Sequence, residues 1–446
     1  MCITKSVISK HLLKHVFGIE HNYLSRLSNN NLCGHHSELH GMRYKYLVRF
    51  KTSKSYGEDN APVFAPRRVT VLTKMTRFQY ERRRQRQMSE NEFRAYLESK
   101  DSDYDRLLLR HKNHQAGLEA VKKAFEAAGI ETRIVERFDL TSSTLDWADA
   151  VFTAGGDGTY LLAASKFIDN NKPLIGLNTD PERSEGHLCL PKRKYPAVNF
   201  AAALKRMLAG DFRWRWLQRI KVTMSGQHSN DTPIELHDQQ LSFPELRFIE
   251  HIAEREQERH PVNITSNPPP VRVLPVFALN EVFIGESLSS RVSYYEFSAD
   301  DGPGEKQKSS GITICTGTGS SSWHFHINHL SVSSVRDILV IANQKTGSQF
   351  PVDDWHMLES VVKEFNDSLR FSPSSPCMAY TIRDPVVNGV FQVSNPRNFA
   401  TKIRIRSRMW DACLVVDGGI SFKFNDGAVA TLEIAKDQAI RTVVFD

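Results

Sequence analysis

The sequence predicts an α/β amino-terminal domain built on a parallel sheet, followed by a β-rich carboxyl-terminal domain. Up to about residue 212, apolar strand-like segments alternate with segments of helical period. From residue 213 onward, short strand-like segments separated by turn residues dominate. Alternating β and α units favour parallel strands with helices on the sheet faces, whereas a run of short strands favours an all-β domain.

The first domain is expected over residues 67–212 and opens with a strand. The segment RRVTVLTK is rich in β-branched residues, and Val69, Val71 and Leu72 are its candidates for burial. A charged, arginine-rich segment follows, for which we expect helix or loop. The sequence then shows a helical pattern that ends at Gly129, a residue typical of helix ends.

The remainder of the first domain continues the alternation. Ile134 and Val135 open a strand, and the apolar segments 147–154 and 172–178 predict two more, with a helix over 161–168 between them. Because these strands are joined through helices, we expect them to be parallel. The sequence therefore predicts a Rossmann-like amino-terminal domain.

The second domain is expected over residues 213–430 and to be β-sandwich-like. The polar, proline-rich stretch 225–270 is interpreted as an insertion, and 353–369 is the one clear helical pattern in this half. Residues 431–446 are expected to pack back on the first domain. Strands are predicted within 213–224, 272–286, 291–300, 309–317, 402–419, 422–427 and 441–445.

The excess of positive charge lies in the leader, residues 1–60. The formal net charge is +7, and residues 1–54 hold nine Lys and Arg but only two acidic residues. Ile8, Leu12 and Val16 recur every four residues between lysines, as in a mitochondrial transit peptide. A disordered tail without a targeting role is the alternative. The rest of the chain is formally neutral, so we expect no nucleic-acid partner.

Two further classes of protein are disfavoured by the sequence. No apolar run approaches the roughly 18–20 residues that a membrane-spanning helix needs, so no membrane partner is expected. The six cysteines are scattered without a CxxC pair, which indicates neither a zinc site nor a disulfide framework.

The alternation of Arg and Trp over 213–216 favours a half-buried strand over a nucleic-acid-binding stripe.

The segment AGGDGTYLLAAS, residues 154–165, combines a strand end, a tight turn and a helix start. Gly155, Gly156 and Gly158 allow unusual φ angles and close approach of the backbone to a ligand. The helix amino terminus near Thr159 favours a phosphate group. Asp157 lies in the same place, where a carboxylate is unfavourable unless it holds Mg²⁺ or accepts a proton. The pattern predicts a phosphate-binding loop with one reactive acid.

These motifs resemble those of the NAD kinases. GGDGT is shared by NAD kinases, by lipid kinases of the diacylglycerol and sphingosine type and, more loosely, by phosphofructokinases. The segment ALNEVFIGE is similar to the Asn-Glu signature of NAD kinases, with Asn280 and Glu281 as the pair. SSGITICTGTGSSSW, residues 309–323, resembles their dinucleotide-binding turn, and VVDGG, residues 415–419, resembles a later Asp-Gly turn.

The segment IGLNTDPERSEGHLCLP, residues 175–191, resembles the mitochondrial branch of this family, whose members also carry a transit peptide. The similarity runs from about Arg67 to the end of the chain. The sequence departs from bacterial-type members at Gly317, where they have proline, and at 321–323, where Ser-Ser-Trp replaces their Thr-Ala-Tyr.

The resemblance implies an enzyme that phosphorylates the 2′-hydroxyl of the adenosine ribose of NAD, with ATP and Mg²⁺ or with inorganic polyphosphate. It implies that Asp157 is catalytic, and it implies a homodimer in the mitochondrial matrix. It names no metal ligand. The implied nucleotide-binding residues are Gly155, Gly156, Gly158, Thr159, Asn178, Asn280, Glu281, Thr316, Thr318, Gly319 and Ser320. A lipid kinase and a non-catalytic dinucleotide sensor are the alternatives.

One further cluster, His324, His326 and His329, suggests a metal site if the segment is a strand, because alternate strand positions share a face. No cysteine or carboxylate stands at ligand spacing, so polar lining or exposed side chains are favoured instead.

Overall fold

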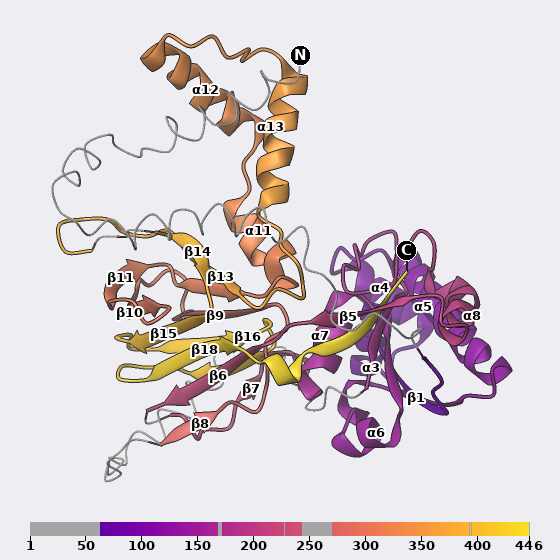
Figure 1. Cartoon of the computed structure of the whole chain (residues 1–446). Coiled ribbons are helices and arrows are strands. Elements are labelled where there is room, and N and C mark those ends of the chain that lie inside the picture. Colours follow the sequence, from indigo (N-terminus) through magenta and orange to yellow (C-terminus); the bar gives the residue numbers. More distant parts are fainter. Residues whose placement is uncertain are drawn as a thin grey trace. The chain divides into compact units, whose positions relative to one another are not determined.

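The structure, a computed structural model, describes residues 63–167, 172–226, 228–242, 270–391, 393 and 395–445 (Figure 1). The predicted leader and most of the predicted insertion lie outside the described residues. The described residues divide into two compact units. One comprises Phe325–Ser372, and the other comprises the remainder, including both the α/β part and the β-rich part.

A parallel sheet forms the α/β part, as predicted. Its strands lie in the order β2-β1-β3-β4, and every neighbouring pair is parallel. Val69, Val71 and Leu72 in the central strand β1 are fully buried, which confirms their predicted role. The strands are β1 (Arg68–Thr73), β2 (Glu131–Val135), β3 (Ala150–Gly155) and β4 (Leu174–Asn178).

Several helices of this part begin at side-chain caps. Ser89 and Glu92 form a reciprocal capping box at the start of α4. Asp103 caps α5 by accepting from the backbone N–H of Arg106, which defines the start of this helix. The helices are α3 (Arg77–Arg84), α4 (Glu90–Glu98), α5 (Tyr104–Ala127), η2 (Arg137–Asp139), α6 (Ser142–Trp147), α7 (Asp157–Lys166), η3 (Ala197–Asn199) and α8 (Phe200–Leu208).

Aromatic side chains join the sheet to two of its helices. The ring centroid of Phe125 on α5 lies 4.9 Å from that of Phe152 on β3 and 5.0 Å from that of Phe200 on α8. Both contacts are edge-to-face, the geometry that the ring quadrupoles favour. This packing supports β3, the strand that leads into the glycine-rich loop.

The β-rich part is a sandwich of two antiparallel sheets, as predicted. Buried residues of both sheets, such as Val222 and Ile284, share one core cluster. One sheet has the order β11-β10-β15-β18-β6-β8, and the other has β14-β13-β12-β9-β16-β17-β7. The first comprises β6 (Ile220–Ser225), β8 (Val271–Val273), β10 (Ser293–Ala299), β11 (Glu305–Ser309), β15 (Lys402–Ser407) and β18 (Val429–Ile434). The second comprises β7 (Ile234–Glu235), β9 (Glu281–Glu286), β12 (Ile312–Cys315), β13 (Met378–Ile382), β14 (Arg397–Ala400), β16 (Ala412–Val416) and β17 (Ile420–Lys423).

Several strands were not predicted, and for β11 there is a clear physical reason. Its sequence, EKQKS, is polar throughout. It lies at the edge of its sheet, where charged side chains remain in solvent and protect the open edge from further pairing. An edge strand of this kind carries no apolar alternation, so the sequence pattern gives no strand signal.

The last strand, β19 (Ile440–Val444), pairs with β5 (Arg213–Leu217) in a two-stranded antiparallel sheet. Val443 belongs to the same buried cluster as the aromatic residues of the α/β core, and Ile440 belongs to the cluster that contains residues of α7. Along β5 the arginines are exposed and the tryptophans half-buried, the pattern of a half-buried strand. The guanidinium of Arg441 lies over the Trp214 ring, 4.4 Å from its centroid.

The unit Phe325–Ser372 is helical, which corrects two expectations. The histidine-containing segment forms helix α11 (Trp323–Asn328) rather than a strand. The helix α13 (Trp355–Ser368) is accompanied by α12 (Val332–Thr346), which was not predicted, and the short α9 (Leu236–Ser242) is a further helix of this half. Val335, Leu339 and Leu358 are buried between α12 and α13. Among the described residues, no helix is long and apolar enough to cross a membrane.

Candidate active site

The glycine-rich loop connects β3 to α7, but its glycines do not act as predicted. None of the three has a positive φ, which corrects the expectation of unusual φ angles. Two of them, Gly155 and Gly156, are required instead because a Cβ atom would collide with a neighbouring side chain. A Cβ on Gly155 would lie 2.2 Å from Thr159 Oγ1, and one on Gly156 would lie 2.8 Å from Ser184 Oγ. A Cβ on Gly158 would meet no described atom within 4 Å, so this glycine leaves open space at the helix start.

Asp157 is the first residue of α7, and its carboxylate is held in place by the backbone. Its two oxygens accept from the backbone N–H groups of His187 and Leu188 at 3.1 and 2.8 Å. A negative charge at a helix amino terminus is also stabilised by the helix dipole. The acid is half-buried and fixed before any substrate arrives.

Asn178 stabilises the loop that holds Asp157. Its side-chain amide is buried, donates to the Ser184 carbonyl at 3.0 Å and accepts from the Asp180 backbone N–H at 2.9 Å. Gly186 has φ +63°, and a Cβ there would lie 2.6 Å from the Asn178 amide nitrogen. Both polar atoms of the Asn178 side chain thus form hydrogen bonds within the protein, and these bonds hold the loop.

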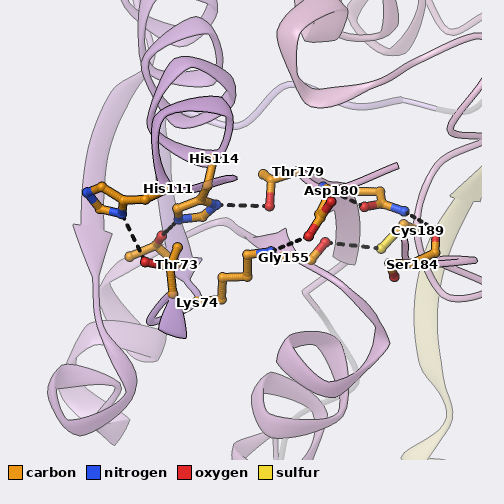
Figure 2. A network of polar contacts seen from close by, with 11 residues as sticks. Thr73, Lys74, His111, His114, Gly155, Thr179, Asp180, Ser184 and Cys189 are labelled. Carbon is orange, nitrogen blue, oxygen red and sulfur yellow. Dashed lines mark hydrogen bonds and ion pairs between the residues drawn. The ribbon is translucent and has the colours of Figure 1, made fainter. Parts of the chain in front are cut away.

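A polar network joins the carboxyl ends of β1 and β4 to helix α5 (Figure 2). The buried ring of His114 contacts the hydroxyl groups of Thr73 and Thr179, each at 2.9 Å. Burial lowers the pKa of His114 to about 4, so the ring is neutral near pH 7. The Lys74 ammonium lies 3.7 Å from the Asp180 carboxylate, and burial lowers the pKa of this lysine.

Sequence reasoning did not single out this network. A usable signal was present, because polar residues that follow parallel strands gather at the carboxyl edge of the sheet, where ligands bind. The backbone N–H of Lys74 donates to the Ala154 carbonyl at 3.1 Å, so the main chain of Lys74 lies next to the start of the glycine-rich loop.

The Asn280–Glu281 pair is shaped by a carboxylate from a distant segment. Asp417 Oδ1 accepts from the backbone N–H groups of Asn280 and Glu281 at 2.8 and 3.0 Å, and Oδ2 accepts from Leu279 at 2.8 Å. Burial raises the pKa of Asp417 to about 6, and these three donors oppose the rise. Asp417 belongs to the predicted VVDGG turn, but its role in fixing this pair was not foreseen.

The turn over 316–320 packs directly on the same pair. The backbone N–H of Thr316 donates to the Asn280 carbonyl at 2.9 Å, and the Thr316 hydroxyl donates to the Leu279 carbonyl at 2.5 Å. A Cβ on Gly319 would lie 2.1 Å from the Asn280 carbonyl oxygen, so only glycine fits there. The structure therefore brings the two predicted motifs together.

Several polar groups of this turn form hydrogen bonds with other groups of the protein. The Thr316 hydroxyl accepts from the N–H groups of Thr318 and Gly319 at 3.1 and 3.2 Å. The Ser320 hydroxyl donates to the Gly317 carbonyl at 2.6 Å. The Thr316 hydroxyl and the N–H groups of Thr318 and Gly319 therefore have partners within the protein.

Three buried oxygens at this place have no hydrogen-bond partner among the described residues. They are Asn280 Oδ1, Glu281 Oε2 and Thr318 Oγ1. Buried polar atoms are almost always paired, so a group of orphaned acceptors indicates a place where a ligand supplies donors. Burial raises the pKa of Glu281 to about 8, with a contribution from the nearby Asp417 charge.

The orphaned acceptors are connected to the glycine-rich loop through α7. Leu279, the residue before Asn280, is fully buried in the same cluster as Tyr160, Ala163 and Ala164 of that helix. One packed cluster thus links the Asn280–Glu281 pair to the helix that begins with Asp157.

The histidine cluster does not form a metal site. His324 is buried, and its ring nitrogen lies 3.1 Å from the Thr381 hydroxyl. Burial lowers its pKa to about 4. In the part of the chain that the structure describes, no three His, Cys, Asp or Glu side chains are grouped as metal ligands.

Comparison with known proteins identifies close relatives. The rat protein "NAD kinase 2, mitochondrial" is 48% identical over 385 residues, covering 86% of this chain and 88% of the relative. The human protein of the same name is also 48% identical, covering 86% of this chain and 85% of the relative. An ATP complex of an NAD kinase from Archaeoglobus fulgidus covers 85% of this chain and 93% of its own, at 15% identity and TM-score 0.45. No protein-family model matches the chain.

Identity of nearly one half over most of both chains confirms the resemblance that the motifs predicted. The chain therefore belongs to the mitochondrial NAD kinase family, whose members are phosphotransferases that act on a hydroxyl group.

Proposed function

We propose that this chain phosphorylates NAD at the 2′-hydroxyl of its adenosine ribose, with ATP as donor, to give NADP. The observation that carries the proposal is the pair of orphaned acceptors, Asn280 Oδ1 and Glu281 Oε2. They directly follow Leu279, which packs in one cluster with the helix that begins with Asp157. Their chemistry suits a sugar that offers two neighbouring hydroxyl donors. The Thr316–Ser320 turn lies beside them and lines the same place.

Glu281 is the residue best suited to hold the sugar. It is 7% exposed, and its raised pKa keeps much of it protonated near pH 7 before substrate binds. Two hydroxyl donors would favour the ionised form, because hydrogen bonds to a carboxylate stabilise its charge. The Asn280 amide donates to the Ser322 hydroxyl at 3.1 Å, which leaves its oxygen turned to act as an acceptor.

Asp157 is proposed to receive the proton of the reacting hydroxyl. An aspartate is a weak base towards a sugar hydroxyl, so its help comes late, as the new bond between the ribose oxygen and the γ-phosphorus forms. The bond from that phosphorus to the bridging oxygen breaks at the same time, and ADP leaves with the electron pair. Because the His187 and Leu188 N–H groups already hold the carboxylate, little ordering is needed at the moment of reaction.

The donor phosphates are proposed to lie at the start of α7. Gly156 carries no capping side chain, and Gly158 leaves room for close approach to the backbone. The main chain of Lys74 lies next to the same loop, and its ammonium lies 3.7 Å from the Asp180 carboxylate. Mg²⁺ would neutralise charge on the transferring group. Asp157 is the carboxylate of this loop. Most ligands of the Mg²⁺ ion would be phosphate oxygens and water, as is usual for this ion.

We also propose a homodimeric enzyme whose leader is a mitochondrial transit peptide. The mitochondrial names of the relatives and the basic, acid-poor composition of residues 1–60 support the second part. The resemblance to the family supports the first. A fluorescent protein fused to residues 1–60 should enter mitochondria, and sedimentation of the purified enzyme should give twice the chain mass.

The decisive experiment uses purified protein with ATP and Mg²⁺ and three acceptors in separate reactions: NAD, NADH and a diacylglycerol or sphingosine. Formation of NADP, identified by mass spectrometry as carrying the new phosphate on the adenosine ribose, supports the proposal. Phosphorylation of the lipid acceptor would favour a lipid kinase. Binding of NAD without turnover would favour a dinucleotide sensor. Inorganic polyphosphate in place of ATP tests the second donor.

A further inference from the structure

Arg219 is a buried charge that the proposed chemistry does not use. It lies between β5 and β6, and its side chain has no solvent exposure. It is the largest of the fully buried side chains among the described residues. Burial lowers its pKa to about 10, which still leaves the guanidinium charged near pH 7. A buried charge is costly unless its hydrogen bonds are well made, so its contacts matter.

The guanidinium binds the carboxyl-terminal end of α7. Its Nη1 donates to the Phe167 carbonyl at 2.6 Å and to the Ala164 carbonyl at 3.3 Å. Phe167 is the C-cap of the helix, and the Ala164 carbonyl accepts from its backbone N–H at 3.2 Å. At this end of a helix several carbonyl groups lack partners within the helix. A positive charge at this end also complements the helix dipole. The same helix carries Asp157 at its other end.

The rest of Arg219 is attached to the β-rich part and to the carboxyl-terminal segment. Its Nε donates to the Gln438 carbonyl at 2.5 Å, and its own carbonyl accepts from the Ala435 N–H at 2.8 Å. The next residue, Ile220, exchanges two backbone hydrogen bonds with Ala278, at 2.8 and 3.0 Å. Ala278 stands two residues before Asn280, so the arginine is anchored close to the orphaned acceptors.

An electrostatic link completes the connection. The Asp417 carboxylate, which fixes the Asn280–Glu281 backbone, raises the pKa of Arg219 against the effect of burial. The Arg219 Nη2 atom has no hydrogen-bond partner among the described residues. A buried charge with an unused donor costs folding free energy, and an apolar side chain at this position would avoid that cost. The presence of arginine is therefore consistent with a role in positioning the neighbouring elements rather than in stabilising the fold.

We infer that Arg219 is a positioning residue that fixes α7, and with it Asp157, relative to the Asn280–Glu281 pair that holds the acceptor ribose. The inference rests on the proposed function, because the spacing matters only if the two ends act on one substrate. Phosphoryl transfer depends on alignment, and a displacement of about 1 Å can cost about 100-fold in rate. Binding of NAD should change little, because Asp417 holds the ribose-binding pair independently of α7.

The test compares Arg219→Met and Arg219→Lys with the wild-type enzyme. The control is Arg137→Met, because Arg137 also joins the α/β part to the β-rich part, through Glu235 at 3.2 Å and through Asp238. Arg137 does not itself bond to α7, and in this variant Glu235 keeps its separate bond to Lys166 of that helix, at 2.5 Å. Three quantities are measured: kcat with saturating NAD and ATP, the Kd of NAD by calorimetry with its stoichiometry, and the melting temperature. Lysine keeps the charge but cannot reach both the α7 carbonyls and Gln438.

For Arg219→Met we expect kcat to fall about 100-fold while the Kd of NAD stays within about threefold, at full stoichiometry. Arg219→Lys should fall between this variant and wild type, and Arg137→Met should keep kcat within about threefold. The inference is overturned if Arg219→Met keeps its kcat, if kcat and NAD binding are lost in parallel, or if Arg137→Met loses as much. It is withdrawn as well if neither Arg219 variant folds. A wild-type enzyme that forms no NADP contradicts the proposed function instead.

Discussion

The Asp417 carboxylate accepts the backbone N–H of Asn280 at 2.8 Å, across 137 residues of sequence. The same side chain accepts from the residues on either side of Asn280, so one acid fixes the path of the chain through the proposed ribose-binding pair. Asp417 itself has φ +48°, a conformation that aspartate and asparagine tolerate better than most residues. This relationship leads to the first of four predictions.

Replacing Asp417 by asparagine should weaken NAD binding about tenfold or more. The asparagine amide oxygen can still accept from some of the backbone N–H groups of Leu279, Asn280 and Glu281. Its NH₂ group cannot accept, so at least one of these buried N–H groups loses its partner. The cost to unfolding free energy should be about 1–3 kcal/mol. Calorimetric titration with NAD and chemical denaturation measure the two effects.

Asp300→Asn is the matched control for that variant. Asp300 also has a positive φ, +49°, and accepts from the backbone N–H groups of Thr401 and Lys402 at 2.7 and 3.0 Å. It lies in the turn between β10 and β11 and holds the start of β15, whereas Asp417 holds the Asn280–Glu281 pair. Asp300→Asn should leave the Kd of NAD unchanged, and equal effects of the two variants would show that Asp417 has no special relation to the ligand.

Asp157→Asn should lower kcat by at least about 100-fold, since removal of a positioned acid or base typically costs 10²–10⁴ in rate. Asparagine keeps the shape but cannot take the proton, and it can accept from only one of the His187 and Leu188 N–H groups. A modest loss of stability, about 1–2 kcal/mol, should accompany the change. Turnover close to wild type in a folded variant would remove Asp157 from the reaction.

Gly158→Ala and Gly156→Ala should fail in different ways. A methyl group at Gly158 meets no described atom within 4 Å, so the variant should fold normally while the KM for ATP rises as the methyl group obstructs the phosphates. A methyl group at Gly156 lies 2.8 Å from Ser184 Oγ, so that variant should lose thermal stability. Unaltered ATP kinetics in Gly158→Ala would place the donor phosphates elsewhere.

His114 should make the protein sensitive to mild acid. Its pKa is lowered to about 4 in the folded protein but is near 6.5 in an unfolded chain, so the unfolded state binds more protons between these values. The unfolding free energy should therefore fall as pH drops from about 6.5 to 4, by up to about 3 kcal/mol from this group. Above pH 6.5 the group should have no effect.

His114→Gln is the variant that isolates this contribution. Glutamine retains a donor and an acceptor for Thr73 and Thr179 without titrating. Urea unfolding at pH 4.5, 5.5 and 7.5 should show a smaller loss of stability in the variant than in wild type. Parallel losses in both proteins would mean that other groups cause the acid sensitivity.

Much of the fold was predictable because its signals are local. The buried strand β1 and the glycine-rich loop are each encoded by a short run of consecutive residues. The structure has both at the positions that the sequence predicts. Two predictions failed for different reasons. The edge strand β11 is polar throughout, so its sequence has no apolar alternation. Helix α12 was missed although Val332, Val335 and Leu339 recur at helical spacing and pack in one cluster.

The sequence by itself determined the fold class, the family and the loop that carries Asp157, because spacing along the chain encodes secondary structure and tight turns. Only the tertiary structure decided which polar groups are satisfied and which remain open for a ligand. Asp417 reaches Asn280 across 137 residues, and Arg219 reaches Gln438 across 219. Hydrogen bonds between such distant partners leave no period in the sequence, because each depends on where the folded chain returns.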